Sequence, residues 1–120
     1  MIAVGGVIQL HRKDSETIKT SCHKIHQNRK KKQPASQFSA GSFFKNPPGD
    51  KSAGQLIDEA GLKGLCVGDA QVSPVHANFI VNTDSATARD IIQLMHKVQQ
   101  VVEEVHGISL EPEVKFLGWD

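Results

Sequence analysis

The sequence predicts an α+β fold, in which a small mixed sheet packs against two main helices within one compact domain. Two long segments, 14–31 and 86–106, carry apolar residues at the three- and four-residue spacing of helices. Short β-rich runs bounded by Gly, Pro, Asn and Ser lie between and after them. The chain has 120 residues, 38% of them hydrophobic, which is enough for one core and too little for two ordinary domains.

The first expected element is a strand over residues 2–10, which is rich in Val and Ile but interrupted by two glycines. Asp14 or Ser15 can cap the helix that follows, and this helix should run to about Lys31. Its apolar face consists of Ile18, Cys22 and Ile25. Residues 32–42 are rich in Pro, Ser, Gln and Gly and are expected to form a loop.

The middle of the chain predicts a short helix and two paired strands. Ser52 followed by Gln55 has the spacing of a capping box and places a helix over about 53–60. Two strands are expected next, over 65–72 and 78–82, and the short turn between them would allow them to pair.

The longest helix should run over about 86–106, with Asp84 or Ser85 as its cap and Gly107 just beyond its end. A last strand is expected over 113–117, because apolar residues there suggest a partly buried position in the sheet. The apolar stripe of the long helix is Ile91, Leu94, Met95, Val98, Val102 and Val105.

Composition excludes several classes of partner. The 14 Lys and Arg residues balance 13 Asp and Glu, so no nucleic acid or anionic lipid partner is expected. No apolar run approaches the about 18 residues of a membrane span, and no export signal is present, so we expect a cytoplasmic protein. Cys22 and Cys66 are isolated and are interpreted as structural thiols. The six histidines lack the spacing of a metal motif, so no metal site is expected.

Several sequence blocks, in a fixed order, carry a family pattern. They are GSFFKNP at 41–47, AGQLI at 53–57, AGLKG at 60–64, HANFIVN at 76–82 and LEPEVKFLG at 110–118. Together they resemble the carboxy-terminal, substrate-binding domain of the UDP-N-acetylenolpyruvoylglucosamine reductases. These are flavin-dependent enzymes, also called UDP-N-acetylmuramate dehydrogenases, of peptidoglycan precursor synthesis and so of cell-wall biogenesis. The resemblance covers nearly the whole chain.

The resemblance implies a division of the chain. Residues 1–12 resemble the edge of the family's flavin domain, and residues 13–120 resemble its substrate domain. The complete enzyme uses FAD and NADPH, and this chain alone is expected to bind neither. The partners implied are UDP-N-acetylglucosamine enolpyruvate and a separate FAD-binding domain. Without that domain we expect the fragment to be inactive and, because its docking face would be exposed, to self-associate weakly.

One position departs from the family pattern. Asp69 replaces the second residue of a more usual Gly-Gly pair. Asp adopts a positive φ less freely than Gly, which leaves the backbone geometry of the turn at 67–70 open.

Two residues are nominated by the resemblance as catalytic. In the family reaction, reduced flavin delivers hydride to one carbon of an enolpyruvyl ether and a protein acid protonates the adjacent carbon. Ser42 would be that acid, with Gly41 before it permitting close approach; a Ser in such a loop is otherwise a turn or cap hydroxyl. Glu113 would stabilise the enediolate, or else is an exposed strand-end residue. Glu111 falls on the same strand face, so alternation alone does not separate the two glutamates.

Five further residues are candidates for contacts with the UDP-sugar. Lys45 and Asn46 suit a loop that meets a phosphorylated sugar, one as a point charge and the other as a donor and acceptor. Lys32 matches a lysine proposed to approach the diphosphate, although it also belongs to a run of solvated charges. Gln55 combines a capping role with proximity to substrate, and His76 is either a substrate-side polar residue or a simple turn histidine.

Two functions follow from these expectations. The leading one is the substrate domain of an NADPH- and FAD-dependent oxidoreductase that converts UDP-N-acetylenolpyruvoylglucosamine to UDP-N-acetylmuramate. The alternative is a stand-alone binding or interaction module, derived from that enzyme, which folds but catalyses nothing.

Overall fold

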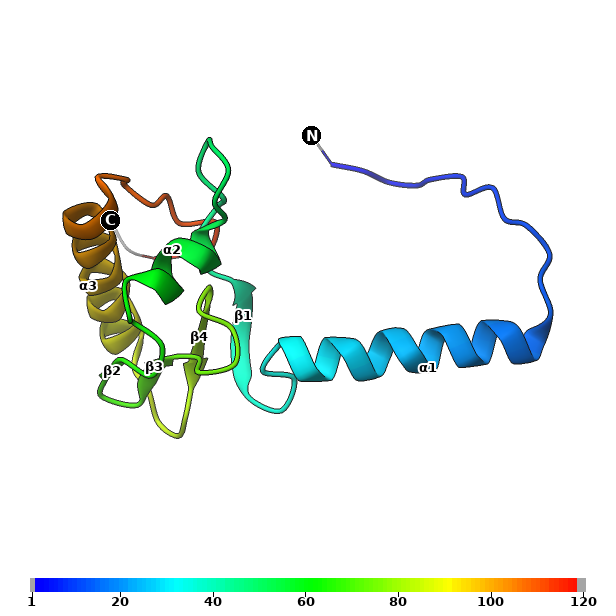
Figure 1. Cartoon of the computed structure of the whole chain (residues 1–120), viewed down its shortest axis with the longest axis horizontal. Helices are drawn as coiled ribbons and strands as arrows, with labels where there is room; N and C mark the ends of the chain where they lie inside the picture. The colour runs from blue at the N-terminus through cyan, green and yellow to red at the C-terminus, as the bar shows by residue number, and fades with distance from the viewer. Residues whose placement is uncertain (1, 119–120) are drawn as a thin grey trace.

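The computed structural model describes residues 2–118. Figure 1 shows a small sheet beside α2 and α3, with α1 projecting away from them. This arrangement confirms the expected α+β class. In order, the elements are α1 (Ser15–Lys32), β1 (Phe38–Ser42), α2 (Ala53–Glu59), β2 (Cys66–Val67), β3 (Ala70–Val72), β4 (Phe79–Asn82) and α3 (Ala88–His106).

The sheet has the strand order β1-β4-β3-β2, and every pairing is antiparallel. The mixed sheet that we expected is therefore not formed, because short turns join β2, β3 and β4 and such turns connect only antiparallel neighbours. The expected pairing of the strand at 78–82 with the one before it is present as β3 with β4. The single strand expected over 65–72 is instead the hairpin of β2 and β3.

The β2–β3 hairpin turns at Gly68 and Asp69. Gly68 has a φ of +54°, and no non-glycine residue among residues 2–118 has a positive φ. Asp69 therefore occupies this turn without left-handed strain. Its backbone carbonyl accepts hydrogen bonds from the N–H and hydroxyl of Thr83, and its carboxylate accepts one from the N–H of Ser85. The turn thereby holds the loop that leads into α3.

Strand β1 lies where we expected a loop. It pairs with β4, with Ser39 opposite Val81 and Ser42 opposite Phe79. The interval from Ser39 to Ser42 is one residue longer than the facing interval in β4, which defines a β-bulge. The local sequence FSAGS lies in a stretch rich in Ser and Gly and buries no residue, so only the pairing with β4, far along the chain, makes this segment a strand.

The helix ends follow hydrogen bonds made by side chains. Ser52 and Gln55 form the expected capping box at the start of α2. Helix α3 ends as expected at Gly107, which has a φ of +68°. Its start differs, because Thr87 and Asp90 form a reciprocal capping box there and neither Asp84 nor Ser85 is the cap.

The core lies between the sheet, α2 and one face of α3. In the expected stripe of α3, Ile91 is partly buried and Val105 is 57% exposed. Burying one large aliphatic side chain contributes roughly 1.5–3 kcal/mol, so the core residues of α3 fix this helix on the sheet. The buried cluster comprises Phe43, Phe44, Ala53, Leu56, Ile57, Leu62, Ala70, Val72, Ala77, Ile80, Leu94, Met95, Val98, Val102 and Leu110.

Helix α1 has the expected bounds but not the expected packing. The carboxylate of Asp14 accepts the N–H of Thr17 at 2.9 Å and so caps the helix. No residue of α1 is buried, and Ile18 and Ile25 are 45% and 67% exposed. Of the two main helices that we expected against the sheet, only α3 therefore packs on it.

Two further expectations were wrong. Residues 2–10 form no strand and are exposed, because no described strand lies beside them to pair with. Residues 113–117 form no strand, and the bridge recorded beside them is an isolated one between Phe44 and Pro112. The two cysteines, Cys22 and Cys66, are free thiols, as their isolated positions predicted, and both are exposed.

Candidate active site

The bulge in β1 places Ser42 at the end of the strand. Gly41, inside the bulge, has a φ of +85°. A Cβ added there would meet no atom of the chain within 4 Å, so within the chain this position needs glycine for its backbone conformation. Bulges turn the side chains that follow them, and here the residue that follows is Ser42.

The structure brings Ser42 and Glu113 together. The carbonyl of Phe43 accepts the N–H of Glu113 at 2.9 Å, and the N–H of Lys45 donates to the carbonyl of Glu111 at 2.9 Å. These two bonds hold the carboxy-terminal segment beside the residues that follow β1. As a result, Ser42 and Glu113 line one hollow of about 420 Å³.

The same pairing separates the two glutamates that alternation left equivalent. Glu111 forms an ion pair with Lys45, whereas Glu113 faces the hollow that contains Ser42. Both partners of the ion pair are at least half exposed, and such surface pairs contribute about 0–1 kcal/mol. A phosphate could therefore displace Glu111 from Lys45 at little cost.

Asn46 has a structural contact of its own. Its side-chain Oδ1 accepts the N–H of Ala53, the first residue of α2, at 3.0 Å. This bond satisfies one of the helix N–H groups that lack an intrahelical acceptor. The amide nitrogen of Asn46 takes no part in that bond and lies on an exposed residue, so it is available to a ligand.

A second hollow contains two of the other predicted residues. Gln55 and His76, together with Lys63, line a space of about 180 Å³ beside α2. The Oε1 of Gln55 accepts the N–H of Ser52 at 2.8 Å, which is half of the capping box. Lys32, the last residue of α1, is exposed and lines neither hollow.

His76 and Asn78 connect this region to the segment after β1. The Nδ1 of His76 accepts a hydrogen bond from the N–H of Asn78 at 3.2 Å. The His76 ring packs edge-on against the ring of Phe79, with 4.9 Å between the ring centroids. Asn78 is buried, and its Oδ1 and Nδ2 bond the N–H and carbonyl of Phe44, each at 2.9 Å. Asn78 was not among the site residues that the sequence nominated. The available signal was a polar residue directly before the buried run of β4, since buried polar side chains must find partners.

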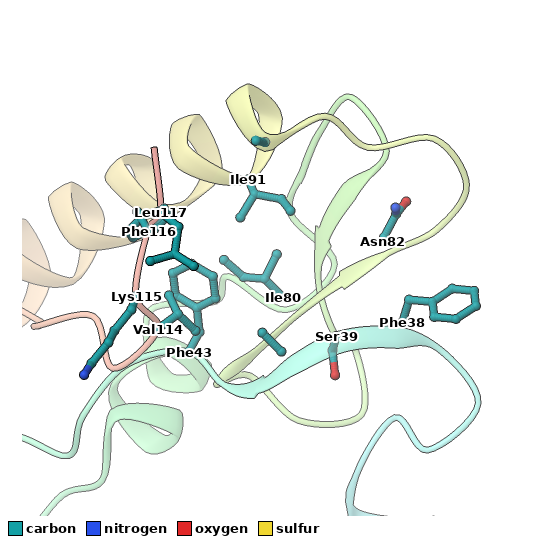
Figure 2. A pocket seen from close by; sticks show the side chains of 12 residues that line it. Phe38, Ser39, Phe43, Ile80, Asn82, Ile91, Val114, Lys115, Phe116 and Leu117 are labelled. Carbon is teal, nitrogen blue, oxygen red and sulfur yellow. The ribbon is translucent and has the colours of Figure 1, made fainter. Parts of the chain in front are cut away.

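An apolar hollow of about 550 Å³ adjoins the one that contains Ser42 (Figure 2), and the two share Ala40 and Val114. Its walls come from β1, β4, the start of α3 and the carboxy-terminal segment. An apolar wall next to polar groups lowers the local dielectric and strengthens their interactions. The side chains that Figure 2 shows around this hollow include Phe43, Ile80, Ile91, Val114 and Phe116.

Within residues 2–118, no group of three or more His, Cys, Asp or Glu side chains is placed to hold a metal ion. Every buried side-chain nitrogen or oxygen in that range already has a hydrogen-bond partner. No helix within that range is both long and apolar enough to cross a membrane.

Comparison with known proteins agrees with this arrangement. Residues 33–117 match the family model described as the carboxy-terminal domain of UDP-N-acetylenolpyruvoylglucosamine reductase. The reductase of that name from Caldanaerobacter subterraneus subsp. tengcongensis is 48% identical over 111 residues, which cover 92% of this chain and 36% of the relative. A UDP-N-acetylenolpyruvoylglucosamine reductase 2 from Symbiobacterium thermophilum is 58% identical over 94 residues, covering 78% of this chain and 30% of the relative.

A solved structure extends the similarity to three dimensions. The crystal structure of the UDP-N-acetylenolpyruvylglucosamine reductase from Thermus caldophilus matches with a TM-score of 0.72 and 43% identity, covering 89% of this chain and 37% of that one. The chain thus spans about a third of the length of the relatives it matches. On this evidence, the chain belongs to the family formed by the carboxy-terminal domains of the UDP-N-acetylenolpyruvoylglucosamine reductases.

Proposed function

We propose that this chain is the substrate side of a UDP-N-acetylenolpyruvoylglucosamine reductase in cytoplasmic peptidoglycan precursor synthesis, where it holds the UDP-sugar and donates a proton to it. One observation carries the proposal: Ser42 and Glu113, from opposite ends of the domain, line the same hollow. A hydroxyl and a carboxyl group in one open hollow suit proton delivery to a bound substrate that itself carries a carboxylate. In this proposal, residues 13–120 are the substrate domain and residues 1–12 belong to the edge of a flavin domain.

The flavin and NADPH are assigned to a partner domain, because this chain matches only 36% of the Caldanaerobacter relative and resembles the family's substrate domain. In the family reaction that cofactor supplies the hydride, which adds to one carbon of the enolpyruvyl double bond. This chain would deliver the proton to the adjacent carbon of the same double bond. Ser42 lies on an exposed stretch of backbone, so a partner domain can approach its hydroxyl from the open side of the hollow.

The proton transfer is simple in outline. The O–H bond of Ser42 breaks as a C–H bond forms at the substrate carbon that carries negative charge, and the resulting alkoxide regains a proton from solvent. Glu113 is placed to meet the substrate carboxyl group, onto which that charge spreads. The bulge at Gly41 and the bond between Phe43 and Glu113 set the mutual placement of these two side chains.

Polar residues near the two hollows would bind the UDP-sugar. Asn46 offers its amide nitrogen to a phosphate oxygen, and Lys45 offers a cation that now pairs with Glu111. Gln55 and His76 would contact the sugar-nucleotide from the hollow beside α2. Lys32, at the end of the projecting helix α1, would add a charge near the diphosphate.

Isothermal titration calorimetry of the purified chain with UDP-N-acetylglucosamine enolpyruvate tests the binding part. We expect weak binding without bound flavin, lost in Asn46→Ala and retained in Ser42→Ala. A well-folded chain that binds no substrate would favour the alternative, a module with no catalytic role.

A chimera tests the catalytic part, in which this chain replaces the matching 36% of the Caldanaerobacter relative. In this chimera, Ser42→Ala should lower kcat by about a hundredfold to ten-thousandfold, the usual contribution of a positioned acid. Glu113→Gln should also lower kcat. Ser39→Ala is the matched control, because Ser39 is an exposed serine of the same strand outside the Ser42 hollow. Equal activity of the two serine variants would disprove the role of Ser42.

A further inference from the structure

We infer that Asn78 is the positioning residue of this site, because its buried side chain fixes the backbone that carries Ser42 and links it to the hollow lined by Gln55 and His76. The inference rests on the proposed function, since it concerns how the same site is held in shape. It assigns no substrate contact to Asn78, which is 5% exposed.

Asn78 binds the segment after β1 through both its side chain and its backbone. Its Oδ1 accepts the N–H of Phe44 and its Nδ2 donates to the carbonyl of Phe44, both at 2.9 Å. Its own backbone carbonyl accepts the N–H of Phe43 at 2.8 Å. Three hydrogen bonds from one residue thus fix the two residues directly after Ser42.

These bonds are part of a longer series that crosses the domain. On one side, the carbonyl of Phe43 accepts the N–H of Glu113. On the other side, the N–H of Asn78 donates to the Nδ1 of His76, which lines the hollow beside α2. The two hollows are therefore joined by an unbroken path of hydrogen bonds that passes through Asn78.

The chemistry of this contact requires an amide. The backbone of Phe44 presents one donor and one acceptor, and a carboxamide can form a hydrogen bond with each. Aspartate would keep the acceptor but place negative charge against the Phe44 carbonyl, and alanine would leave both Phe44 groups without their partner. The β-sheet does not replace these contacts, since regular pairing of β1 with β4 ends at Ser42.

A shift of this backbone would displace Ser42 and Glu113 relative to each other. Reaction rates depend steeply on such placement, and a misplacement of about 1 Å can cost about a hundredfold. We therefore expect loss of Asn78 to act on catalysis through Ser42 and to leave most of the core unaffected.

Amide hydrogen exchange of the full chain is the first test, with Asn78→Ala and Asn78→Asp beside the wild type. Exchange at Phe44 and Glu113 should become at least about tenfold faster in both variants, as expected for a local opening. Exchange at core positions such as Val81 and Leu94 should stay unchanged. A uniform increase across the core, or no increase at Phe44, would overturn the inference.

Asn82→Asp is the matched control. Asn82 lies four residues further along the same segment, and its Oδ1 accepts the N–H groups of Asp84 and Ala86, each at 3.0 Å. Aspartate supplies the same acceptor, so this variant makes the same chemical change without losing a bond. It should leave exchange at Phe44 at the wild-type rate.

A double-mutant cycle in the chimera described above is the second test. Asn78→Ala should lower kcat by about tenfold to a hundredfold with KM within about twofold. In the Ser42→Ala background the same change should have a clearly smaller effect, because the hydroxyl is gone and only Glu113 is left to be displaced. If the two effects multiply, Asn78 acts on the fold as a whole and the inference is wrong.

The two tests separate failure of the inference from failure of the proposed function. A chimera that is inactive with the wild-type domain would refute the proposed catalytic role. The exchange rates at Phe44 and Glu113 would still decide whether Asn78 fixes that segment. If Asn78→Asp does not fold, Asn78→Ala, which buries no charge, supplies the same comparison.

Discussion

Replacing Asn46 with aspartate or alanine separates two roles of one side chain. Its Oδ1 accepts the N–H of Ala53 at 3.0 Å, and aspartate offers an equivalent oxygen. A carboxylate near a helix start is favourable, so Asn46→Asp should leave the free energy of unfolding unchanged or raise it by about 0.5 kcal/mol. Asn46→Ala leaves that partly buried N–H unpaired and should lower the free energy by about 1 kcal/mol.

Binding should respond differently from stability. Both substitutions remove the amide nitrogen proposed to meet a phosphate oxygen, and a hydrogen bond to a charged group contributes about 1.5–3 kcal/mol. The affinity for UDP-N-acetylglucosamine enolpyruvate should therefore fall by at least about tenfold in both variants. Asn46→Asp also adds repulsion between its carboxylate and the diphosphate, so its loss should be the larger of the two.

Urea unfolding and calorimetric titration of the same samples measure the two effects. Asn28→Asp is the charge control, because it makes the same substitution on the exposed surface of α1. Stability near wild type together with lost binding in Asn46→Asp would support a ligand contact. Substrate affinity equal to wild type in Asn46→Asp would refute it and leave Asn46 as a helix cap alone.

Three other predictions concern stability and association. Gly68→Ala should lower the free energy of unfolding by about 2–3 kcal/mol in urea titrations, since a Cβ there lies 2.9 Å from the Cγ of Asp90 at a φ of +54°. Gly61 has a φ of +71°, but a Cβ there would meet no atom within 4 Å, so Gly61→Ala should lower the free energy of unfolding by only about 1 kcal/mol. Equal losses in the two variants would refute the clash between the new Cβ and Asp90. The backbone N–H and hydroxyl of Thr87 donate hydrogen bonds to Asp90 and hold the pKa of its carboxyl below the ordinary 3.8. The stabilisation that these bonds give the folded state is therefore complete above pH 3.8. It should disappear as pH falls from 3.8 through the folded-state pKa, and Asp90→Asn should flatten that acid-side loss in urea midpoints taken at successive pH values. Weak self-association, measured by light scattering over a range of concentrations, should disappear when residues 1–12 and their exposed apolar side chains are deleted; a clean monomer in the intact chain would contradict it.

Local signals in the sequence predicted the elements whose stability is local. The capping box of Ser52 and Gln55 needs only four consecutive residues, and it is present as expected. The start of α3 shows the limit of this reasoning, because Asp84, Ser85 and Thr87 are all good caps. Thr87 is the one whose partner, Asp90, lies three residues further on and returns the bond.

Elements that depend on distant partners could not be predicted in this way. Strand β1 exists because β4 pairs with it, and residues 2–10 are strand-like in composition but have no described strand to pair with. The candidate site likewise combines residues that local motifs nominate with contacts between residues distant in sequence. Motifs nominated Ser42 and Glu113, but only the bond between Phe43 and Glu113 shows that their hollow is shared. Asn78 was missed because its partners, Phe43 and Phe44, are distant in sequence.

Helix α1 has a consequence for how the chain melts. Its 18 residues bury no side chain, and an isolated helix of this length in water is near the midpoint between helix and coil. Favourable charges at its two ends stabilise it instead: Glu16 lies in the first turn and four basic residues lie in the last. Heating should therefore produce a gradual, salt-sensitive loss of ellipticity from α1, well below the sharp cooperative transition of the sheet and α3.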